Sequence, residues 1–383
     1  MTYFNTLADS DRPVRMIQVG AGGMGRAWLE TLVRSADTDI VGLVDLDLGA
    51  ARDAAESIGR PDLPIARSLT DLASDPGADA VLNVTVPAAH HAVTTQALLL
   101  GLPVLSEKPA APTVAEAISL AATAEVTAQL LMVSQSRRYF RQLAAFRRDV
   151  RNAGPVGLLT NQFFRAAHFG GFREEMPYPL LVDMAIHPFD VARYLLGSEP
   201  VAVYCDSFNP SWSWYAGDAS AVAIFEFEGD ARFEYTGSWC SPGMETSWNG
   251  SWRASSAGAT VLWDGEGAPV VEAPVVEGSG PAGITADDAP EEIAGALAEF
   301  VAALRSGVVP WGEIHDNIGS LAMVEAAVRS ASTRTRILIA DVVESAYAQA
   351  LAAEERPAVH DRLRGWGSGS AGLHPAARLE HLA

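Results

Sequence analysis

Short apolar runs alternate with amphipathic stretches along the N-terminal part of the chain. Each run has the length and residue types of a buried β-strand, and the stretches between the runs have helical spacing. The predicted strands are Val14–Val19, Asp39–Val44, a weak one near Ile65, Ala80–Val84, Pro103–Leu105 and Leu130–Val133. Strands that alternate with helices in this way predict a doubly wound parallel sheet.

From Val156 onward the alternation of strands and helices gives way to a different order of elements. A strand at Leu158–Ala166 and a helix at Leu180–Leu196, closed by Gly197, precede a series of strands without helices between them. These strands are Val201–Phe208, Ala219–Phe227, Ala231–Trp239, Ser247–Ser255, Ala259–Trp263 and Val270–Val276, the last limited to a sheet edge by Pro274. Consecutive strands predict an antiparallel sheet. Helices near 289–306, 316–332 and 341–354 follow.

A chain of 383 residues predicts more than one domain. We expect a first domain over 14–136, built on the parallel sheet. The second, over 137–355, is expected to be an α+β domain with a large open, mainly antiparallel sheet. Residues 356–383 show no clear period and predict a loose tail.

Composition narrows the classes of partner. A formal net charge of −20 argues against binding to nucleic acid or to anionic membranes, which reward positive charge. No apolar run reaches the roughly 18 residues of a membrane span, and the N-terminus lacks the pattern of a signal peptide. Two cysteines, Cys205 and Cys240, are no disulfide framework, so a cytoplasmic location is expected.

A glycine-rich turn, Gly20-Ala21-Gly22-Gly23-Met24-Gly25, joins the first strand to the first helix. Its spacing is that of a dinucleotide fingerprint. Gly20 allows the tight turn, Gly22 lets the backbone approach a pyrophosphate, and Gly25 packs helix on strand. We expect Gly20, Gly22, Gly23, Met24 and Gly25 to bind a dinucleotide on a Rossmann domain.

The second strand ends in Asp45, at the spacing of the acid that binds the adenosine ribose hydroxyls. Asp45 and Asp47 would repel a 2′-phosphate, and no arginine stands beside Asp45 in the sequence. The sequence therefore predicts NAD rather than NADP.

Lys108 is the single lysine among the chain's 27 basic residues, and it closely follows a buried strand. Arginine is permanently charged, whereas lysine can give up a proton near neutrality when buried. One explanation is genomic drift from lysine to arginine. The other is that this position needs a group that donates, accepts or relays a proton, and its place after a strand favours this explanation.

Asp183 and His187 lie at positions i and i+4 of a predicted apolar helix, so they share one helix face. A carboxylate one turn from an imidazole can orient it and raise its basicity. The pair can also be purely structural. A metal half-site would need a third ligand from His168, His90 or His91, and nothing in the spacing requires one, so no metal is expected.

Three motifs together resemble those of the glucose–fructose oxidoreductase, inositol dehydrogenase and rhizopine-catabolism (Gfo/Idh/MocA) family of NAD(P)-dependent oxidoreductases. Gly20–Gly25 resembles its fingerprint, Glu107-Lys108-Pro109 its E-K-P motif, and Asp183–His187 its D-x-x-x-H motif. Asp316–Arg336 looks like the family's late helix. The resemblance covers about residues 14–340.

The resemblance implies hydride transfer between the nicotinamide of NAD and a secondary alcohol of a sugar, inositol or related cyclic polyol. The nicotinamide is expected near Thr85, Pro87, Glu107 and Lys108. Lys108, Asp183 and His187 are the expected catalytic residues, and either Lys108 or His187 can be the base. The family's histidine after the strand-four proline has two candidates, His90 and His91, of which His91 looks the closer match. A homodimer or homotetramer formed through the C-terminal sheet is also implied.

Further substrate contacts are expected from Arg138, near the end of a predicted strand, and from Arg165 and His168, just upstream of the Asp183 helix. Trp212, Trp214 and Tyr215 can stack on a sugar face, but cores and interfaces use the same residues. Two other functions compete with a dehydrogenase. One is a glycoside hydrolase or lyase that retains NAD and oxidises its sugar transiently, and the other is a non-catalytic sugar or NAD sensor.

Overall fold

The computed structural model describes residues 4–8, 11–73, 77–273 and 289–373. The chain divides into two compact units, which are described separately. The nucleotide unit comprises Met1–Ser136, Pro290–Ile318 and Val343–Ala383. The sheet unit comprises Arg137–Ala289 and Gly319–Val342. Among the described residues, no helix combines the length and apolar character needed to cross a bilayer.

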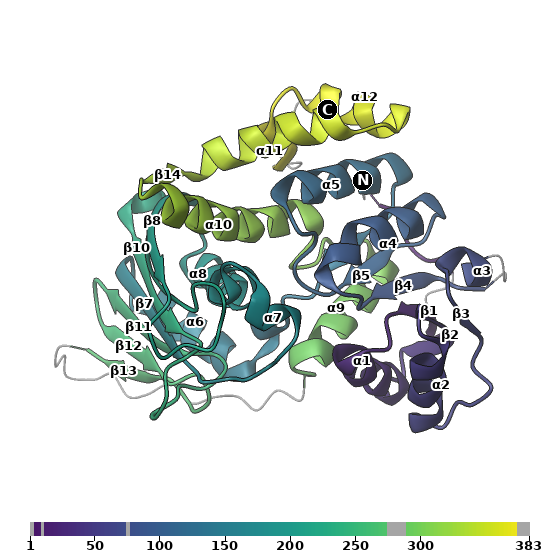
Figure 1. Ribbon diagram of the computed structural model, residues 1–383, viewed down its shortest axis with the longest axis horizontal. Coiled ribbons are helices and arrows are strands. Elements are labelled where there is room, and N and C mark those ends of the chain that lie inside the picture. The colour runs from purple at the N-terminus through teal and green to yellow at the C-terminus, as the bar shows by residue number, and fades with distance from the viewer. Residues whose placement is uncertain (1–3, 9–10, 74–76, 274–288, 374–383) are drawn as a thin grey trace. The chain divides into compact units, whose positions relative to one another are not determined.

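The nucleotide unit is built on a six-stranded parallel sheet in the order β3-β2-β1-β4-β5-β6. Its strands are β1 (Val14–Val19), β2 (Thr38–Val44), β3 (Ile65–Ala66), β4 (Ala80–Asn83), β5 (Val104–Ser106) and β6 (Leu131–Val133). The connecting helices are α1 (Gly23–Arg34), α2 (Leu48–Ser57), α3 (Leu69–Ala73), α4 (Pro87–Leu99) and α5 (Val114–Thr127). Helices α1 and α2 cover one face and α4 and α5 the other (Figure 1). The predicted doubly wound parallel sheet is confirmed.

Three C-terminal helices belong to this unit as well: α9 (Glu292–Ser306), α12 (Pro357–Trp366) and α13 (Gly369–Leu373). Helix α9 packs against α1, and α12 packs against α5. Val359, Leu363 and Trp366 are buried along one side of α12. The expected loose tail is therefore folded as far as residue 373, because its apolar side chains bury on α5. Residues 374–383 lie outside the described part of the chain.

The division of the chain differs from the expected one in a second respect. Residues 290–318 cluster with the nucleotide unit rather than with the second domain. The remaining helices, α10 (Ile314–Thr333) and α11 (Ile339–Ala353), each contain a point where the two units divide. A helix period carries no information about which neighbour its apolar face will meet, so this assignment needed the structure.

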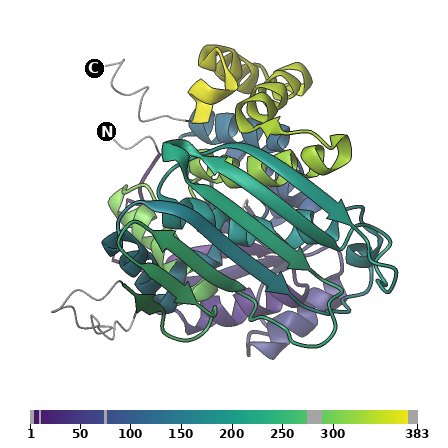
Figure 2. The same cartoon turned by 90° about the vertical axis from the view of Figure 1, so that its left-hand side faces the viewer.

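The sheet unit contains an eight-stranded sheet in the order β13-β12-β11-β7-β10-β9-β8-β14. Its strands are β7 (Val156–Phe164), β8 (Pro200–Phe208), β9 (Ser220–Phe227), β10 (Arg232–Ser238), β11 (Ser251–Ser256), β12 (Thr260–Trp263), β13 (Val270–Glu272) and β14 (Ile337–Leu338). Only β7 and β10 pair in parallel among these described strands, so the prediction of a mainly antiparallel sheet is confirmed. Figure 2 shows the sheet face-on.

Helices α6 (Arg141–Asn152) and α8 (Ile186–Leu196) pack against this sheet. Phe189 of α8 makes edge-on contacts with Phe225, Phe233 and Tyr235 of the sheet. These aromatic side chains are fully buried. Their burial stabilises the unit, because each aromatic ring removes a large apolar area from water.

The predicted helix Leu180–Leu196 is interrupted near its start. A π-helical turn, η2, covers Leu180–Met184, with a hydrogen bond of 2.8 Å from Ala185 N to Leu180 O. Helix α8 then runs to Leu196 and ends at Gly197, whose φ of 62° closes it as predicted. Single π turns are often found at functional sites. This one contains Asp183.

Candidate active site

Two glycines of the fingerprint turn are required by packing. Gly20 has a φ of +107°, and a Cβ there would lie 2.4 Å from Val84 O. A Cβ on Gly25 would lie 2.4 Å from Gly20 O. Gln18 is completely buried, and its Nε2 donates hydrogen bonds of 2.8 Å to both Gly20 O and Gly25 O. Gln18 thus holds the turn closed, a role that the apolar pattern of its strand concealed.

The other two glycines of the turn face open space. A Cβ on Gly22 or Gly23 would meet no atom within 4 Å, and α1 begins at Gly23. The first N–H groups of a helix point outward and attract anions. The turn therefore fits a pyrophosphate, since its backbone is accessible where a phosphate must approach closely. Met24, which follows Gly23, is half exposed.

Asp45 follows β2 and is tied to the fingerprint turn. Its Oδ2 accepts a hydrogen bond of 2.7 Å from Ala21 N, and its Oδ1 accepts one of 2.8 Å from Asp47 N. An ionised carboxylate has about four acceptor positions, so Asp45 keeps capacity for ribose hydroxyls. Asp47 caps α2 instead, with Oδ1 accepting from Gly49 N and Ala50 N.

The turn after β4 is organised by Asn83, a buried residue that sequence reasoning missed. Its Oδ1 accepts from both Thr85 N (3.2 Å) and Thr85 Oγ1 (2.7 Å). Its Nδ2 donates to Thr94 Oγ1 at 3.0 Å. Pro87 then starts α4, where the missing N–H of proline costs nothing. Thr85 is therefore held in one conformation at the carboxyl end of the sheet.

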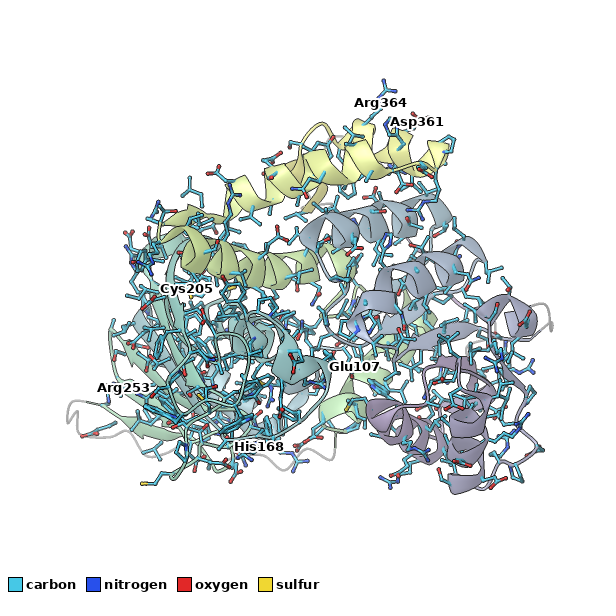
Figure 3. All side chains as sticks on the ribbon, viewed as in Figure 1. Glu107, His168, Cys205, Arg253, Asp361 and Arg364 are labelled. Atoms are coloured by element: carbon cyan, nitrogen blue, oxygen red, sulfur yellow. The ribbon has the colours of Figure 1, made fainter. Side chains whose placement is uncertain are left out.

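Glu107 and Lys108 follow β5 at the same edge of the sheet. The indole Nε1 of Trp28 donates to Glu107 Oε1 at 2.8 Å, and Lys108 N donates to Glu107 Oε2 at 3.1 Å. Trp28 lies on α1 and is fully buried. Glu107 and Lys108 are half-buried, and Figure 3 labels Glu107 in the loop after β5. One bond thus connects the fingerprint helix to the Glu107-Lys108-Pro109 turn.

His90, rather than His91, contacts these loops. The Nδ1 of His90 lies 2.6 Å from Pro109 O, and its Nε2 lies 3.0 Å from Thr85 O. Burial lowers the pKa of His90, although both carbonyl oxygens favour the protonated form. His91 faces Ser119 on α5, with Nε2 3.4 Å from Oγ. These contacts place His90 at the two loops, and the match of the family's histidine to His91 stays a prediction.

Asp183 has a partner that the sequence did not suggest. The Nε of Arg173 donates to Asp183 Oδ2 at 2.6 Å, and the Asp183 side chain is 11% exposed. His187 is half-buried at the second position of α8. Arg173 belongs to the short helix α7 (Phe172–Glu175), which is too short and too polar to be recognised by periodicity.

The loop that carries Arg173 is anchored at several points. The Arg173 guanidinium lies 5.5 Å from the Phe169 ring and 4.8 Å from the Phe172 ring. Tyr215 donates from its hydroxyl to Ala167 O at 2.5 Å. Burial, with the charge of Glu174 nearby, raises the pKa of Tyr215 to about 12, so this donor keeps its proton at neutral pH. The loop therefore presents a positioned cation to Asp183.

The other predicted substrate residues have intramolecular partners. Arg138 is buried and forms two hydrogen bonds of 2.7 Å with Asp190. Arg165 donates to Thr246 O at 2.9 Å and lies 4.5 Å from the Trp248 ring. His168, labelled in Figure 3, is exposed and stacks on Trp214 at 3.8 Å. A ligand contact by any of the three stays a prediction, and Arg138 has a structural role in its ion pair.

Across the described ranges, no group of three or more His, Cys, Asp or Glu side chains is placed to hold a metal ion. Cys205 and Cys240 are both free and buried.

Comparison with known protein families shows which family this chain belongs to. Residues 14–135 match the family model described as an oxidoreductase family with an NAD-binding Rossmann fold, and residues 159–257 match the Gfo/Idh/MocA C-terminal domain. The chain belongs to the Gfo/Idh/MocA family. Its N-terminal fold is thus an NAD-binding one, in agreement with the open glycine turn and Asp45.

Individual relatives are distant. An uncharacterized protein, y4oX, of Sinorhizobium fredii is 28% identical over 58% of this chain and 65% of its own length. Inositol 2-dehydrogenase 1 of Saccharopolyspora erythraea is 33% identical over 50% of this chain and 56% of its own length. The matched region therefore spans less than two thirds of these relatives.

One solved structure has the same fold over most of the chain. It is an oxidoreductase from Agrobacterium radiobacter in complex with NAD+, L-tartaric acid and magnesium. The TM-score is 0.74 at 18% identity, covering 85% of this chain and 98% of the other. At that identity the likeness concerns the fold, and it agrees with the predicted Rossmann domain followed by an α+β domain.

Proposed function

We propose that this protein is an NAD-dependent dehydrogenase acting on a secondary alcohol of a sugar, inositol or related cyclic polyol. The observation that carries the proposal is the bond from Trp28 to Glu107, which ties the dinucleotide turn to the loop holding the chain's single lysine. The name of the Saccharopolyspora relative supports the substrate class.

In this proposal, Gly22, Gly23 and Met24 hold the cofactor's pyrophosphate and Asp45 holds its adenosine ribose. Thr85, Pro87 and Glu107 flank the nicotinamide end. NAD, when bound, supplies the hydride acceptor. The chain's own residues must then remove one proton from the alcohol and stabilise the charge that develops on its oxygen.

We assign these tasks to Lys108, Asp183 and His187. His187 accepts the hydroxyl proton, and Asp183, held by Arg173, stabilises the imidazolium. Lys108 stabilises the developing alkoxide or relays the proton. Arg138, Arg165 and His168 are retained as candidate substrate contacts, and Arg138 also forms an ion pair with Asp190.

The test is reduction of NAD by the purified protein against a panel of inositols, pyranoses, aminosugars and sugar acids. Turnover confined to one stereochemical class would support the dehydrogenase and name its substrate. Release of an aglycone from glycosides without net NADH would instead establish the NAD-retaining hydrolase or lyase. Absence of both activities would contradict the proposal.

We further propose that the protein forms a homo-oligomer through the sheet unit. Tyr204 of β8 and Ile224 of β9 are cross-strand neighbours, and each is about half exposed (49% and 48%). Val201, Phe208 and Val222 extend this exposed apolar face. Large exposed apolar patches favour association. Light scattering on wild type and on Ile224→Glu would test it, with Val308→Glu in the nucleotide unit as the control.

A further inference from the structure

Arg67 lies beside Asp45 although the two are distant in sequence. Strands β2 and β3 run parallel with Val44 opposite Ala66, so Asp45 and Arg67 are the next residues on neighbouring strands. The ladder continues to this point, with Asp45 N donating to Ala66 O at 3.1 Å. Neighbouring strands lie about 4.8 Å apart. An arginine therefore stands next to the acid that binds the adenosine ribose.

The Arg67 side chain is turned toward the end of β2. Its Nη1 donates to the carbonyl oxygen of Leu46, the residue after Asp45, at 2.6 Å. This bond uses one of the five N–H donors of a guanidinium. Arg67 is exposed, so the remaining donors are accessible to a ligand.

The carboxylates of Asp45 and Asp47 would repel a 2′-phosphate, but backbone N–H groups partly compensate their negative charge. Both oxygens of Asp45 accept backbone N–H groups, from Ala21 and Asp47. The carboxylate of Asp47 accepts two N–H groups at the start of α2. Backbone donors lower the negative potential around a carboxylate, because their partial positive charges lie within hydrogen-bond distance.

We propose that Arg67 binds the 2′-phosphate of NADP, so that the adenosine site accepts NADP as well as NAD. An arginine near the ribose-binding acid is the recognised means of accommodating that phosphate. Arginine and phosphate match geometrically, since two parallel N–H groups can reach two phosphate oxygens. No arginine stands beside Asp45 in the sequence, but in the folded sheet Arg67 is its neighbour on the adjacent strand.

Calorimetric titration of the purified full chain tests the proposal without reference to any substrate. NAD and NADP are compared, together with the fragments AMP and 2′,5′-ADP, which differ in the 2′-phosphate. Arg67→Ala should raise the dissociation constant of NADP about tenfold or more, since it removes charge-assisted hydrogen bonds to the phosphate, and should leave that of NAD nearly unchanged. The same selectivity is expected between the two fragments.

Arg60→Ala is the matched control. Arg60 also donates to a backbone carbonyl of β2, that of Ile40, but well before the strand's carboxyl end. The Arg60→Ala substitution should not change the ratio of the NADP and NAD dissociation constants. Higher ionic strength should weaken NADP binding to wild type more than to Arg67→Ala.

Three results would overturn the proposal. The first is wild-type protein that binds NAD but not NADP at millimolar concentration. The second is an Arg67→Ala variant whose NADP-to-NAD ratio changes less than about threefold. The third is an equal change of that ratio in Arg60→Ala.

Discussion

The indole of Trp28 donates a hydrogen bond of 2.8 Å to the carboxylate of Glu107. Trp28 lies in the helix after β1 and Glu107 in the loop after β5, with β4 between these strands in the sheet. The second oxygen of Glu107 accepts from Lys108 N at 3.1 Å. Glu107 thus fixes the backbone of the proposed catalytic lysine relative to the dinucleotide turn.

Trp28→Phe should lower kcat/KM about ten- to hundredfold, because small displacements of catalytic groups are costly. Since the turn of Gly22 and Gly23 is untouched, the dissociation constant of NAD should change little. Trp366→Phe is the matched control: Trp366 donates in the same way to Glu125 Oε2 at 2.9 Å, from α12 to α5. Equal losses of activity in both variants would show that Trp28 acts through general stability alone.

Lys108→Met should reduce kcat by at least about a hundredfold, the lower bound for loss of an acid–base group. NAD affinity should be nearly intact. Lys108→Arg separates the two explanations for the single lysine: it keeps the positive charge but cannot give up a proton. Activity of the arginine variant close to wild type would attribute the lysine to genomic drift and exclude a proton relay at this position.

His187→Ala should also lose at least about a hundredfold in kcat with NAD affinity preserved. Unchanged turnover would remove His187 from the mechanism. If the Lys108 variants are inactive while His187→Ala still reduces NAD, Lys108 is the base. Stopped-flow measurement of NADH formation in a single turnover distinguishes a slow chemical step from slow product release.

Arg173→Met should lower kcat about tenfold, because Asp183 would lose the cation bound to its Oδ2. Its KM should change less than its kcat if Arg173 acts through Asp183. Arg253→Met, an exposed arginine on β11 labelled in Figure 3, is the control. A rise in KM alone would identify Arg173 as a substrate contact instead.

The surroundings of His315 predict that the stability of the folded protein depends on pH. Burial alone lowers its pKa, but Glu313 and Glu125, 2.7 and 3.3 Å from its two ring nitrogens, raise it to about 10. The unfolded value is about 6.5. Stabilisation by the charged ring is therefore complete below about pH 6.5 and is lost progressively as pH rises toward about 10.

Calorimetry of wild type and His315→Gln tests this. The melting temperature of wild type should exceed that of the variant at pH 6.5, and the gap should narrow by pH 9.5. His360→Gln, at a half-buried histidine of α12, should show no such change. A gap that stays constant across this range would contradict a protonated His315 in the folded protein.

Much of the fold could be predicted because it rests on local periodicity. Apart from the two-residue strand β14, which was missed, the strands of both sheets were located to within a few residues, since buried runs and alternating runs have distinct patterns. Helix α12 was missed because its three buried side chains, Val359, Leu363 and Trp366, stand among charged and small residues. The π turn at Leu180–Met184 was missed because a helix pattern does not report its hydrogen-bond register.

The candidate site was predicted less completely than the fold. Motif spacing identified Gly20, Asp45, Lys108 and Asp183, whose chemistry depends on position along a strand or helix. It missed Gln18, Trp28, Asn83 and Arg173, which are polar or aromatic groups that hold those residues through long-range bonds.

The sequence by itself determined the dinucleotide turn, the alternation of strands and helices in the first domain, and the family. These features follow from backbone conformation and from burial, which neighbouring residues encode. The tertiary structure decided which side chains meet: His90 rather than His91 at Pro109, and Arg67 beside Asp45. A parallel sheet brings together the ends of strands that are far apart in the chain, so a search limited to sequence neighbours cannot find such pairs.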